Sequence, residues 1–469
     1  MAARGSGGAD GAMTRADGAW LRRGRRRARW SRVGVSALLV MFALGLLTLL
    51  RPAEAAAAPS SCPFGGGPAF RLQAFEADRM RSLYLQTQVL AAANQLFPGD
   101  DEFALPALKV GEARVKTLAA MIPPQLLHAI AWIESDINQV HINDPYGELG
   151  RALISPDCGY GIMQITSTID NDGGLPSRYE ALVGTHFAYN IAAGARILAE
   201  KWNEDYFPVV GERDPRFIES WYFALWAYNG WVWINHPGNR MFDPARGTYD
   251  CDTDTSDYLD YPYQERVLGC VINPPIVDGQ RLWEPHPVDL PNIPSVTAPG
   301  GALDPDLFWQ SLDQVRERMS MSLPSGAVQA AIGFGALQDR TALLGMPEAD
   351  DLVDELELSS SELTARGAEL LIANRGSGLL AWRVLETPSW LEVGFQAGVA
   401  LGSGYRFTRG PDESRIPIAA AAGGVPEGSH RGRIELEFHY PDGTSERESV
   451  AISLDKQGAA FYEAGRPQS

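Results

Sequence analysis

The stretch PPQLLHAIAWIES at residues 123–135 carries the features on which the fold depends. Two prolines suit the first turn of a helix. Apolar residues follow with helical spacing: Leu126, Leu127, Ile130 and Ile133. Glu134 lies near the predicted helix end, where apolar neighbours and unpaired carbonyl groups both disfavour a carboxylate. We therefore expect a raised pKa for Glu134, as a general acid requires. The alternative is a solvent-facing glutamate, which a Glu-Ser pair alone would favour.

A second motif, GYGIMQIT, occupies residues 159–166. Gly159 and Gly161 allow tight turns or the close approach of a ligand. Met163 lies among apolar residues and is expected to pack, at least in part, in the core. Gln164 would need hydrogen-bond partners if buried, and a substrate amide or hydroxyl group can supply one.

The third motif, ALWAYNGW at residues 224–231, is rich in aromatic residues. Most such rings belong to a core, although some can stack on sugars. The Tyr228 hydroxyl can hydrogen-bond the acid, and Asn229 can bind a substrate acetamido group. In NIAAGARIL, at residues 190–198, Asn190 and Gly194 suit a helix that packs closely against its neighbour.

Glu134-Ser135, GYGIMQIT, NIAAGARIL and AYNGW, in this order, resemble the SLT domain of lytic transglycosylases, in the lysozyme-like superfamily. The resemblance covers roughly residues 115–270. It implies a mainly α, lysozyme-like fold with a groove for peptidoglycan glycan strands. The seven histidines are scattered and form no HExxH pair, so no cofactor or metal ion is predicted. The resemblance also implies Glu134 as the single catalytic acid. The substrate-binding residues that it implies are Ser135, Met163, Gln164, Tyr228 and Asn229.

The resemblance also implies a reaction. Glu134 would protonate the oxygen between N-acetylmuramic acid and N-acetylglucosamine, while the substrate's own acetamido carbonyl stabilises the positive charge. The ionised Glu134 would then take the proton of the muramyl 6-hydroxyl as this oxygen closes on C1. The product is a 1,6-anhydro end, and no second carboxylate is required.

Two alternatives remain open. The segment between Ser135 and Gly159 is longer than is common in the family, and it carries four acidic residues: Asp136, Asp144, Glu148 and Asp157. If one of these activates a water, the protein is a hydrolytic muramidase similar to goose-type lysozymes. The alternative from another class is a non-catalytic protein that binds the cell wall.

The length and the charge of the chain indicate its overall organisation. A chain of 469 residues is expected to form two folded units with linkers. The formal charge is -18, but residues 1–55 carry +7, which leaves -25 on the remainder and argues against nucleic-acid binding. An apolar run at 33–50 follows the basic residues. Residues 1–55 are therefore predicted to be a signal peptide or signal anchor that engages the membrane at least during export.

The predicted order of domains after the export segment is a helical segment, the transglycosylase domain, a Pro-rich linker with a short helix, a β-sandwich and a tail: 56–114, 115–271, 272–350, 351–456 and 457–469. Within the first two, helical spacing is seen at 70–97 and 107–121, and further helices are expected at 186–202 and 215–231.

The C-terminal segments are short, alternating and separated by turn residues, which predicts about seven strands in an antiparallel sandwich. LIANRGSGLLAWRV, PSWLEV and PEGSHRGRIELEF loosely resemble BACON-type and Ig-like modules of exported bacterial proteins. This resemblance implies a domain that binds carbohydrate or another wall component, or that spaces the enzyme from a surface.

Four cysteines follow the export segment: Cys62, Cys158, Cys251 and Cys270. An exported, extracytoplasmic chain with four cysteines usually forms disulfides, here with three pairings open, of which Cys251–Cys270 is the most local. The acidic run at 250–260 departs from the calcium-binding pattern of an EF-hand and is read as a solvated loop.

Overall fold

The computed structural model describes residues 62–64, 70–73, 77–141, 149–169, 174–251, 258–292, 316, 319–330, 345–350, 352, 355–359, 368–405, 413–421 and 424–456. The chain divides into two units, Met1–Glu54 and Ala55–Ser469. All described residues belong to the second unit, and they include neither the predicted export segment (1–55) nor the predicted tail (457–469). No helix among the described residues is long and apolar enough to span a membrane.

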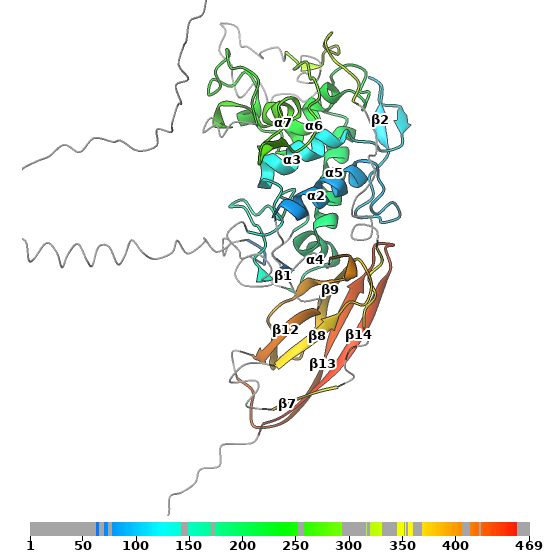
Figure 1. The fold of residues 1–469 in the computed structure, drawn as a ribbon, viewed down its shortest axis with the longest axis vertical. Coiled ribbons are helices and arrows are strands. Elements are labelled where there is room, and N and C mark those ends of the chain that lie inside the picture. Colours follow the sequence, from blue (N-terminus) through cyan, green and yellow to red (C-terminus); the bar gives the residue numbers. More distant parts are fainter. Residues whose placement is uncertain are drawn as a thin grey trace, which may run out of the picture. The chain divides into compact units, whose positions relative to one another are not determined.

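The first half of the described chain is mainly helical, as predicted (Figure 1). Its helices are α2 (Ala77–Ala92), α3 (Pro124–Ser135), α4 (Arg178–Thr185), α5 (Phe187–Asn203), α6 (Tyr222–Tyr228) and α7 (Tyr263–Ile272), with 3-10 turns η1 (Ile218–Trp221), η2 (Trp233–Asn235) and η3 (Tyr258–Asp260). Buried residues from all six helices form one core. A mainly α region therefore surrounds the motifs identified in the sequence.

Helix α3 confirms the prediction made for residues 123–135. Pro124 occupies its first turn, and Leu126, Leu127 and Ile130 are completely buried. The helix ends because Asp136 adopts the left-handed conformation, with φ of 51°, while its backbone N–H bonds to carbonyls of the last turn. Glu134 therefore occupies the final turn of a helix whose opposite face is anchored in the core.

Three sequence predictions need correction. Residues 70–73 form strand β1 (Phe70–Gln73) rather than the start of a helix. The predicted helix at 107–121 is wrong, since β2 (Leu108–Val110) and β3 (Lys116–Leu118) make an antiparallel hairpin there. Its turn contains Gly111 at φ of 79° and Arg114 at φ of 54°, which no helix accommodates. The helix predicted at 215–231 is shorter and consists of η1 followed by α6.

The C-terminal region forms sheets. Its strands are β7 (Glu355–Ser359), β8 (Ala368–Ala373), β9 (Leu379–Glu386), β10 (Leu391–Val393), β11 (Ala397–Leu401), β12 (Glu413–Ala420), β13 (Gly428–His439) and β14 (Ser445–Lys456). A seven-stranded sheet has the order β4-β1-β11-β9-β13-β14-β7, where β4 is Leu149–Gly150, and a second sheet has the order β10-β12-β8. Residues of both sheets share one core.

The expected antiparallel pairing holds only in part. Strand β7 pairs in parallel with β14, and β1 pairs in parallel with β11. Neither β1 nor β7 is joined to its parallel partner by a short turn, so neither is constrained to run antiparallel to it.

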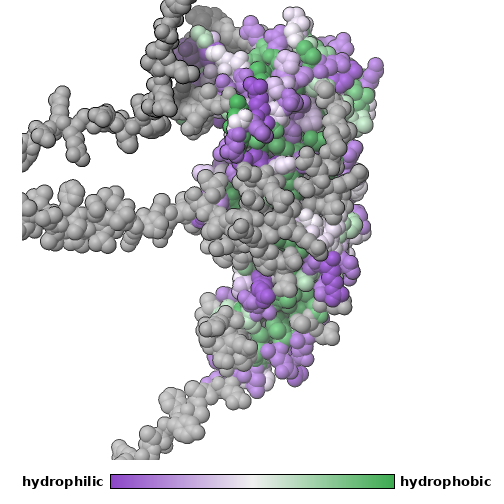
Figure 2. Space-filling view, viewed as in Figure 1, coloured by the Kyte–Doolittle hydropathy of each residue, from purple (hydrophilic) through white to green (hydrophobic). Residues whose placement is uncertain are grey.

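On the face seen in Figure 2, hydrophilic and hydrophobic residues are intermixed over the helices and the sheets.

Described parts of the predicted linker pack on the helical region. The backbone N–H of Gly211 donates to Met321 at 2.8 Å, and that of Met321 donates to Val209 at 2.9 Å. The backbone N–H of Asp289 donates to the carboxylate of Glu219 at 2.9 Å. Residues 289 and 319–323 therefore belong structurally to the helical region. A hairpin of β5 (Ile276–Val277) and β6 (Gln280–Arg281) directly follows α7.

Candidate active site

Glu134 is partly exposed at the end of α3, where it faces the start of α7. The hydroxyl of Tyr263, the first residue of α7, donates a hydrogen bond to Glu134 Oε1 at 2.5 Å. Tyr263 is itself buried, with 1% of its surface exposed. Because α3 and α7 pack against each other, the carboxyl group and its donor are held on two rigid elements.

The electrostatic environment of Glu134 favours the protonated acid. Burial raises the pKa of Glu134 from 4.5 to about 7, although the Tyr263 hydrogen bond and the Arg266 charge both lower it. The negative charge of Asp157 adds to the rise. Burial also raises the pKa of the Tyr263 hydroxyl well above 10, so this group keeps its proton and remains a donor. Glu134 can therefore give up and take back a proton near neutral pH.

Ser135 ties the helix end to the GYGIMQIT turn. Its hydroxyl donates to the carbonyl of Ile162 at 2.8 Å and accepts from the backbone N–H of Asn138 at 3.2 Å. The single hydroxyl proton of Ser135 is thus engaged by the backbone. The structure places Ser135 where it fixes the turn relative to Glu134.

Met163 lies in the core beneath the turn, with none of its surface exposed. A Cβ added to Gly194 of α5 would lie 2.6 Å from the Met163 Cβ, so the small residue at 194 makes room for this side chain. The backbone N–H of Met163 donates to Asn190 Oδ1 at 2.9 Å. The buried Asn190 amide also donates to the Tyr160 carbonyl at 2.7 Å. Asn190 and Gly194 therefore have the packing roles expected of them.

Only one of the two polar atoms of the Gln164 side-chain amide has a hydrogen-bond partner among the described residues. Its Nε2 donates to the carbonyl of Gly161 at 2.7 Å, whereas its buried Oε1 has no hydrogen-bond partner among the described residues. A Cβ added to Gly159 would lie 2.8 Å from that oxygen. A side chain at 159 would therefore clash with this oxygen, so the glycine allows the Gln164 side chain to pack against the backbone.

Tyr228 and Asn229 end helix α6. The Tyr228 hydroxyl donates to the Met163 carbonyl at 2.9 Å, and its ring lies nearly parallel to that of Tyr263, with centroids 6.5 Å apart. Asn229 is exposed, and its Oδ1 accepts from Asn235 at 3.1 Å. The expected bond from Tyr228 to the acid is not formed, because the Tyr228 hydroxyl is used by the turn.

Sequence reasoning missed Tyr263. It follows Pro262 and begins a helix, so a helix start is visible in the sequence, but nothing local indicates that this hydroxyl reaches Glu134. Of the rings in and around ALWAYNGW, Trp221, Tyr222 and Trp226 are completely buried and belong to the core.

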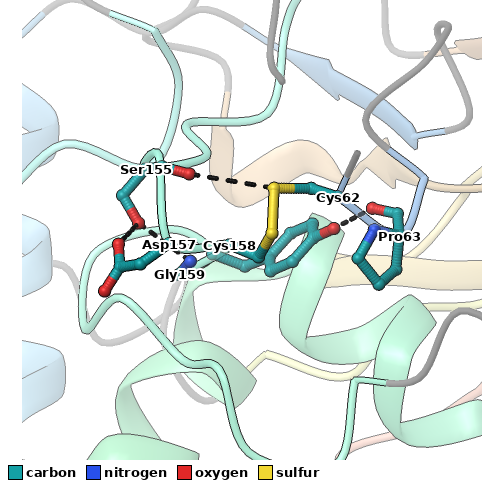
Figure 3. Close-up of a disulfide and its surroundings, with 7 residues drawn as sticks. Cys62, Pro63, Ser155, Asp157, Cys158 and Gly159 are labelled. Atoms are coloured by element: carbon teal, nitrogen blue, oxygen red, sulfur yellow. Dashed lines mark hydrogen bonds between the residues drawn. A yellow bond between two sulfur atoms is a disulfide. The ribbon is translucent and has the colours of Figure 1, made fainter. Parts of the chain in front are cut away.

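The disulfides settle the pairing that the sequence left open. Cys251 is bonded to Cys270, and Cys62 is bonded to Cys158 directly before Gly159 (Figure 3). Asp157 is exposed in the same loop, and its carboxylate accepts from the Ser155 hydroxyl at 2.5 Å. Asp144 and Glu148, two other acidic candidates, lie outside the described residues, as do Asp252, Asp254 and Asp257 of the acidic run.

The geometry agrees with a comparison to protein families, in which residues 111–231 match the family model described as "Transglycosylase SLT domain". The chain contains a transglycosylase SLT domain. The match includes Glu134 and all the residues of the GYGIMQIT, NIAAGARIL and AYNGW motifs. It ends before Tyr263, which the structure adds to the site of this SLT domain.

Other comparisons add little to this assignment. No curated protein matches the chain. Among solved structures, the YadV chaperone is similar at 12% identity and a TM-score of 0.19, over 23% of this chain and 53% of that one. The periplasmic chaperone SfaE is similar at 8% identity and a TM-score of 0.19, over 23% of this chain and 56% of that one. The chain thus spans about half the length of each, and likeness at this level carries no conclusion.

The SLT domain indicates the general class of function. Domains of this family belong to lytic transglycosylases, which act on peptidoglycan in the periplasm or cell wall. The two disulfides fit that compartment, since disulfides form and persist in oxidising surroundings.

Proposed function

We propose that the protein is a lytic transglycosylase that cleaves the β-1,4 bond between N-acetylmuramic acid and N-acetylglucosamine and leaves a 1,6-anhydro-muramyl end. The observation that carries this proposal is the pair formed by Glu134 and Tyr263. One carboxyl group with a pKa of about 7 is held by a hydroxyl donor on a neighbouring helix. A group that is half ionised near neutral pH suits a reaction in which it must act first as an acid and then as a base.

In the first step, protonated Glu134 donates its proton to the glycosidic oxygen, and the C1–O bond breaks. The 2-acetamido carbonyl oxygen of the muramyl residue bonds to C1 and takes up the positive charge. N-acetylglucosamine leaves with its 4-hydroxyl restored. Tyr263 stabilises the carboxylate that has formed, because its hydroxyl donates to Oε1.

In the second step, the Glu134 carboxylate removes the proton of the muramyl 6-hydroxyl, and the 6-oxygen attacks C1. The bond from C1 to the acetamido oxygen breaks, and the acetamido group is restored. Glu134 is again protonated, so the cycle closes without the consumption of water.

The turn opposite Glu134 would hold the glycan. The unpartnered Oε1 of Gln164 needs a donor, and an N–H or O–H group of an amino sugar is suitable. Asn229 is exposed, and its Nδ2 remains available to a substrate carbonyl when its Oδ1 accepts from Asn235. Ser135, Met163 and Tyr228 would support these contacts from beneath by fixing the backbone of the turn.

Purified peptidoglycan digested with the full chain tests the proposal. Mass spectrometry of the released fragments is expected to show anhydro-muramyl ends, which weigh 18 Da less than reducing ends because one water is absent. Reducing ends would identify a hydrolase instead. Absence of any released fragment would identify a protein that binds the wall without cutting it.

A hydrolytic muramidase is the second candidate, and Asp157 is the observation in its favour. This exposed carboxylate is near enough for its charge to raise the pKa of Glu134. If Asp157 activates a water, Asp157→Asn is expected to abolish cleavage. In a transglycosylase the same substitution is expected to leave anhydro products at a similar rate.

We also propose that residues 1–55 engage the membrane at least during export, and that the C-terminal sheets bind carbohydrate or another wall component. A membrane-flotation assay on cells that express the full chain tests the first. Pull-down of the chain with purified peptidoglycan, before and after substitution of exposed residues of β13 and β14, tests the second.

A further inference from the structure

The strands at the centre of the seven-stranded sheet are shared by two cores. In β9, Leu380 and Trp382 belong to the core between the two sheets, whereas Leu379 and Ala381 belong to the core of the helical region. Strand β11 alternates in the same way, since Ala400 faces the first core, and its neighbours Val399 and Leu401 face the second. Strands that are apolar on both faces are covered on both faces. The sheet therefore belongs to the catalytic region as much as to the C-terminal one.

Helix α4 covers the face of the sheet that is turned to the helical region. It contacts β1, β9 and β11. Two polar contacts reinforce this packing: Arg383 donates to the Pro176 carbonyl at 3.1 Å, and the Tyr189 hydroxyl donates to the Tyr440 carbonyl at 3.3 Å. The C-terminal sheets thus form a fixed support for α4 and the strands beside it.

The same sheet continues into the segment that precedes GYGIMQIT. Phe70 of β1 is paired with Ala397 of β11, and Leu72 of β1 is paired with Gly150 of β4. Strand β4 belongs to the long segment between Ser135 and Gly159. This long segment therefore contributes a strand to the seven-stranded sheet.

From β4, backbone pairing leads directly to the candidate site. Ala152 forms an antiparallel bridge with Val140, four residues after the end of the α3 cap. The backbone N–H of Gly161 donates to the Leu153 carbonyl at 2.9 Å. Backbone hydrogen bonds and the short chain segment from Gly150 to Leu153 thus connect β11 to the turn that contains Gln164.

Phe70 is the side chain at the centre of this connection. Only 5% of its surface is exposed, and its ring lies 6.3 Å from that of Tyr160 in an edge-on arrangement. It also packs so closely on α4 that a Cβ added to Gly184 would lie 2.5 Å from the ring. Phe70 therefore contacts the sheet, helix α4 and the GYGIMQIT motif at once.

A covalent bond fixes the other end of the same segment (Figure 3). Cys62 is joined to Cys158, which directly precedes Gly159. The buried hydroxyl of Tyr160 donates to the carbonyl of Pro63. The N-terminal strap, defined as residues 62–64 together with 70–73, is thus attached to the turn on one side and to the C-terminal sheet on the other.

We infer that the N-terminal strap, with Phe70 as its positioning residue, holds the GYGIMQIT turn in the conformation that binds glycan strands, using the C-terminal sheet as its support. Glu134 and Tyr263 are held separately, by α3 and α7. Loosening the strap should therefore weaken glycan binding, while the pKa of Glu134, which burial chiefly determines, should change little. The inference rests on the proposed function only in taking peptidoglycan glycan as the ligand.

Binding is best measured with full chains that also carry Glu134→Gln, because the result then does not depend on turnover. Phe70→Ala in this background is expected to weaken binding to purified peptidoglycan about tenfold, since small displacements of a positioning element have large effects. Cys62→Ser with Cys158→Ser, which frees the other end of the strap, is expected to have a similar effect.

Ile452→Ala is the matched control. Ile452 is a buried residue of β14 in the core between the sheets, so its truncation lowers stability without touching the strap. Binding by this variant is expected to equal that of the Glu134→Gln chain at temperatures well below the unfolding midpoint of each protein.

Turnover gives an independent readout. With Glu134 intact, Phe70→Ala is expected to raise KM about tenfold and to leave the basic limb of the pH profile near 7, where Glu134 ionises. Unchanged binding in both strap variants, or a loss of binding in Ile452→Ala as large as theirs, would overturn the inference. Absence of anhydro products from the wild-type chain would contradict the proposed function but would leave the binding comparison valid.

Discussion

The two sides of the candidate site are held in different ways. Glu134 and Tyr263 form the acid side, where each residue lies at the end of a helix and the two helices pack directly. The GYGIMQIT turn forms the binding side, where Cys158, Gly161 and Gln164 all have positive φ and no regular element spans them. The acid side depends on the direct packing of two helices, whereas the binding side depends on ties to the N-terminal strap and, through it, to the C-terminal sheet. Chemistry and binding should therefore respond to different substitutions.

The largest effect is expected on the acid side. Glu134→Gln removes the proton donor and should lower the release of fragments from peptidoglycan by at least about 10³-fold, because general acid catalysis supplies factors of this order. Retained activity would show that another group is the acid. Binding to peptidoglycan, for which Glu134 is not needed as a proton donor, should be nearly unchanged.

The same substitution should alter stability with pH. The folded protein holds the pKa of Glu134 near 7 instead of 4.5. In the wild-type protein, the contribution of Glu134 to the free energy of unfolding is therefore fully present below pH 4.5 and is lost as the pH rises through 7. Glu134→Gln lacks this loss and should be more stable at pH 8 by about 2 kcal/mol, allowing for partial exposure. Denaturant unfolding of both proteins at pH 4.5 and pH 8 measures the difference, which should vanish at the lower pH.

Tyr263→Phe tests the second member of the acid side. It removes a hydrogen bond that stabilises the carboxylate, so the pKa of Glu134 should rise above about 7 and the basic limb of the pH profile should move upward. We expect the rate at pH 6 to fall roughly 10-fold to 100-fold because the acid is less well oriented. A downward shift of the limb would show that the bond does not favour the ionised form.

On the binding side, Gly161→Ala should destabilise the protein. Gly161 has φ of 68°, and an added Cβ would lie 2.6 Å from the amide of Asn190, so backbone strain and a clash should together cost about 3 kcal/mol. Gly111→Ala is the matched control, because its φ is 79° but nothing lies within 4 Å of an added Cβ. It should cost only about 1 kcal/mol. Equal losses, measured by denaturant unfolding, would show that the contact with Asn190 is unimportant.

The smallest effect is expected for Asp157→Asn. Loss of the negative charge should lower the pKa of Glu134 slightly, so the basic limb should move to lower pH, with less than about a twofold change in rate at pH 6. Inactivity of this variant would show that Asp157 takes part in the reaction together with Glu134, and would favour the hydrolytic mechanism.

The difference between the two sides also explains what the sequence could predict. Helix α3 and the raised pKa of Glu134 follow from neighbours in sequence, so both were predicted. Asn190 and Gly194 were expected to pack closely because α5 has a clear helical pattern. Tyr263 is 129 residues from Glu134, and no local pattern connects them. The sequence pattern predicts a helix where strand β1 forms, because the strand that pairs with β1, β11, lies near the other end of the chain.

The prediction of a helix at 107–121, where β2 and β3 form a hairpin, is wrong for a related reason. The residues of this hairpin include several with good helix propensity, such as Ala113 and Lys116, yet Arg114 at the turn donates to the carbonyls of Glu204 and Phe207 in another part of the chain. Tertiary contacts of this kind override local propensity. The C-terminal strands were recognisable from alternation, but their attachment to the helical region was not, since Ala381 and Ala397 give no sign of which core they face.

The parallel pairing of β1 with β11 has a consequence for the order in which the protein folds. The paired residues Phe70 and Ala397 are more than 300 positions apart in sequence. During synthesis from the N-terminus, β1 emerges early but cannot pair with β11 until more than 300 further residues have followed. Long-range pairing of this kind forms late in folding. The ties that β1 makes to the GYGIMQIT turn and to the C-terminal sheet would thus be completed only after residues 397–401 have been made.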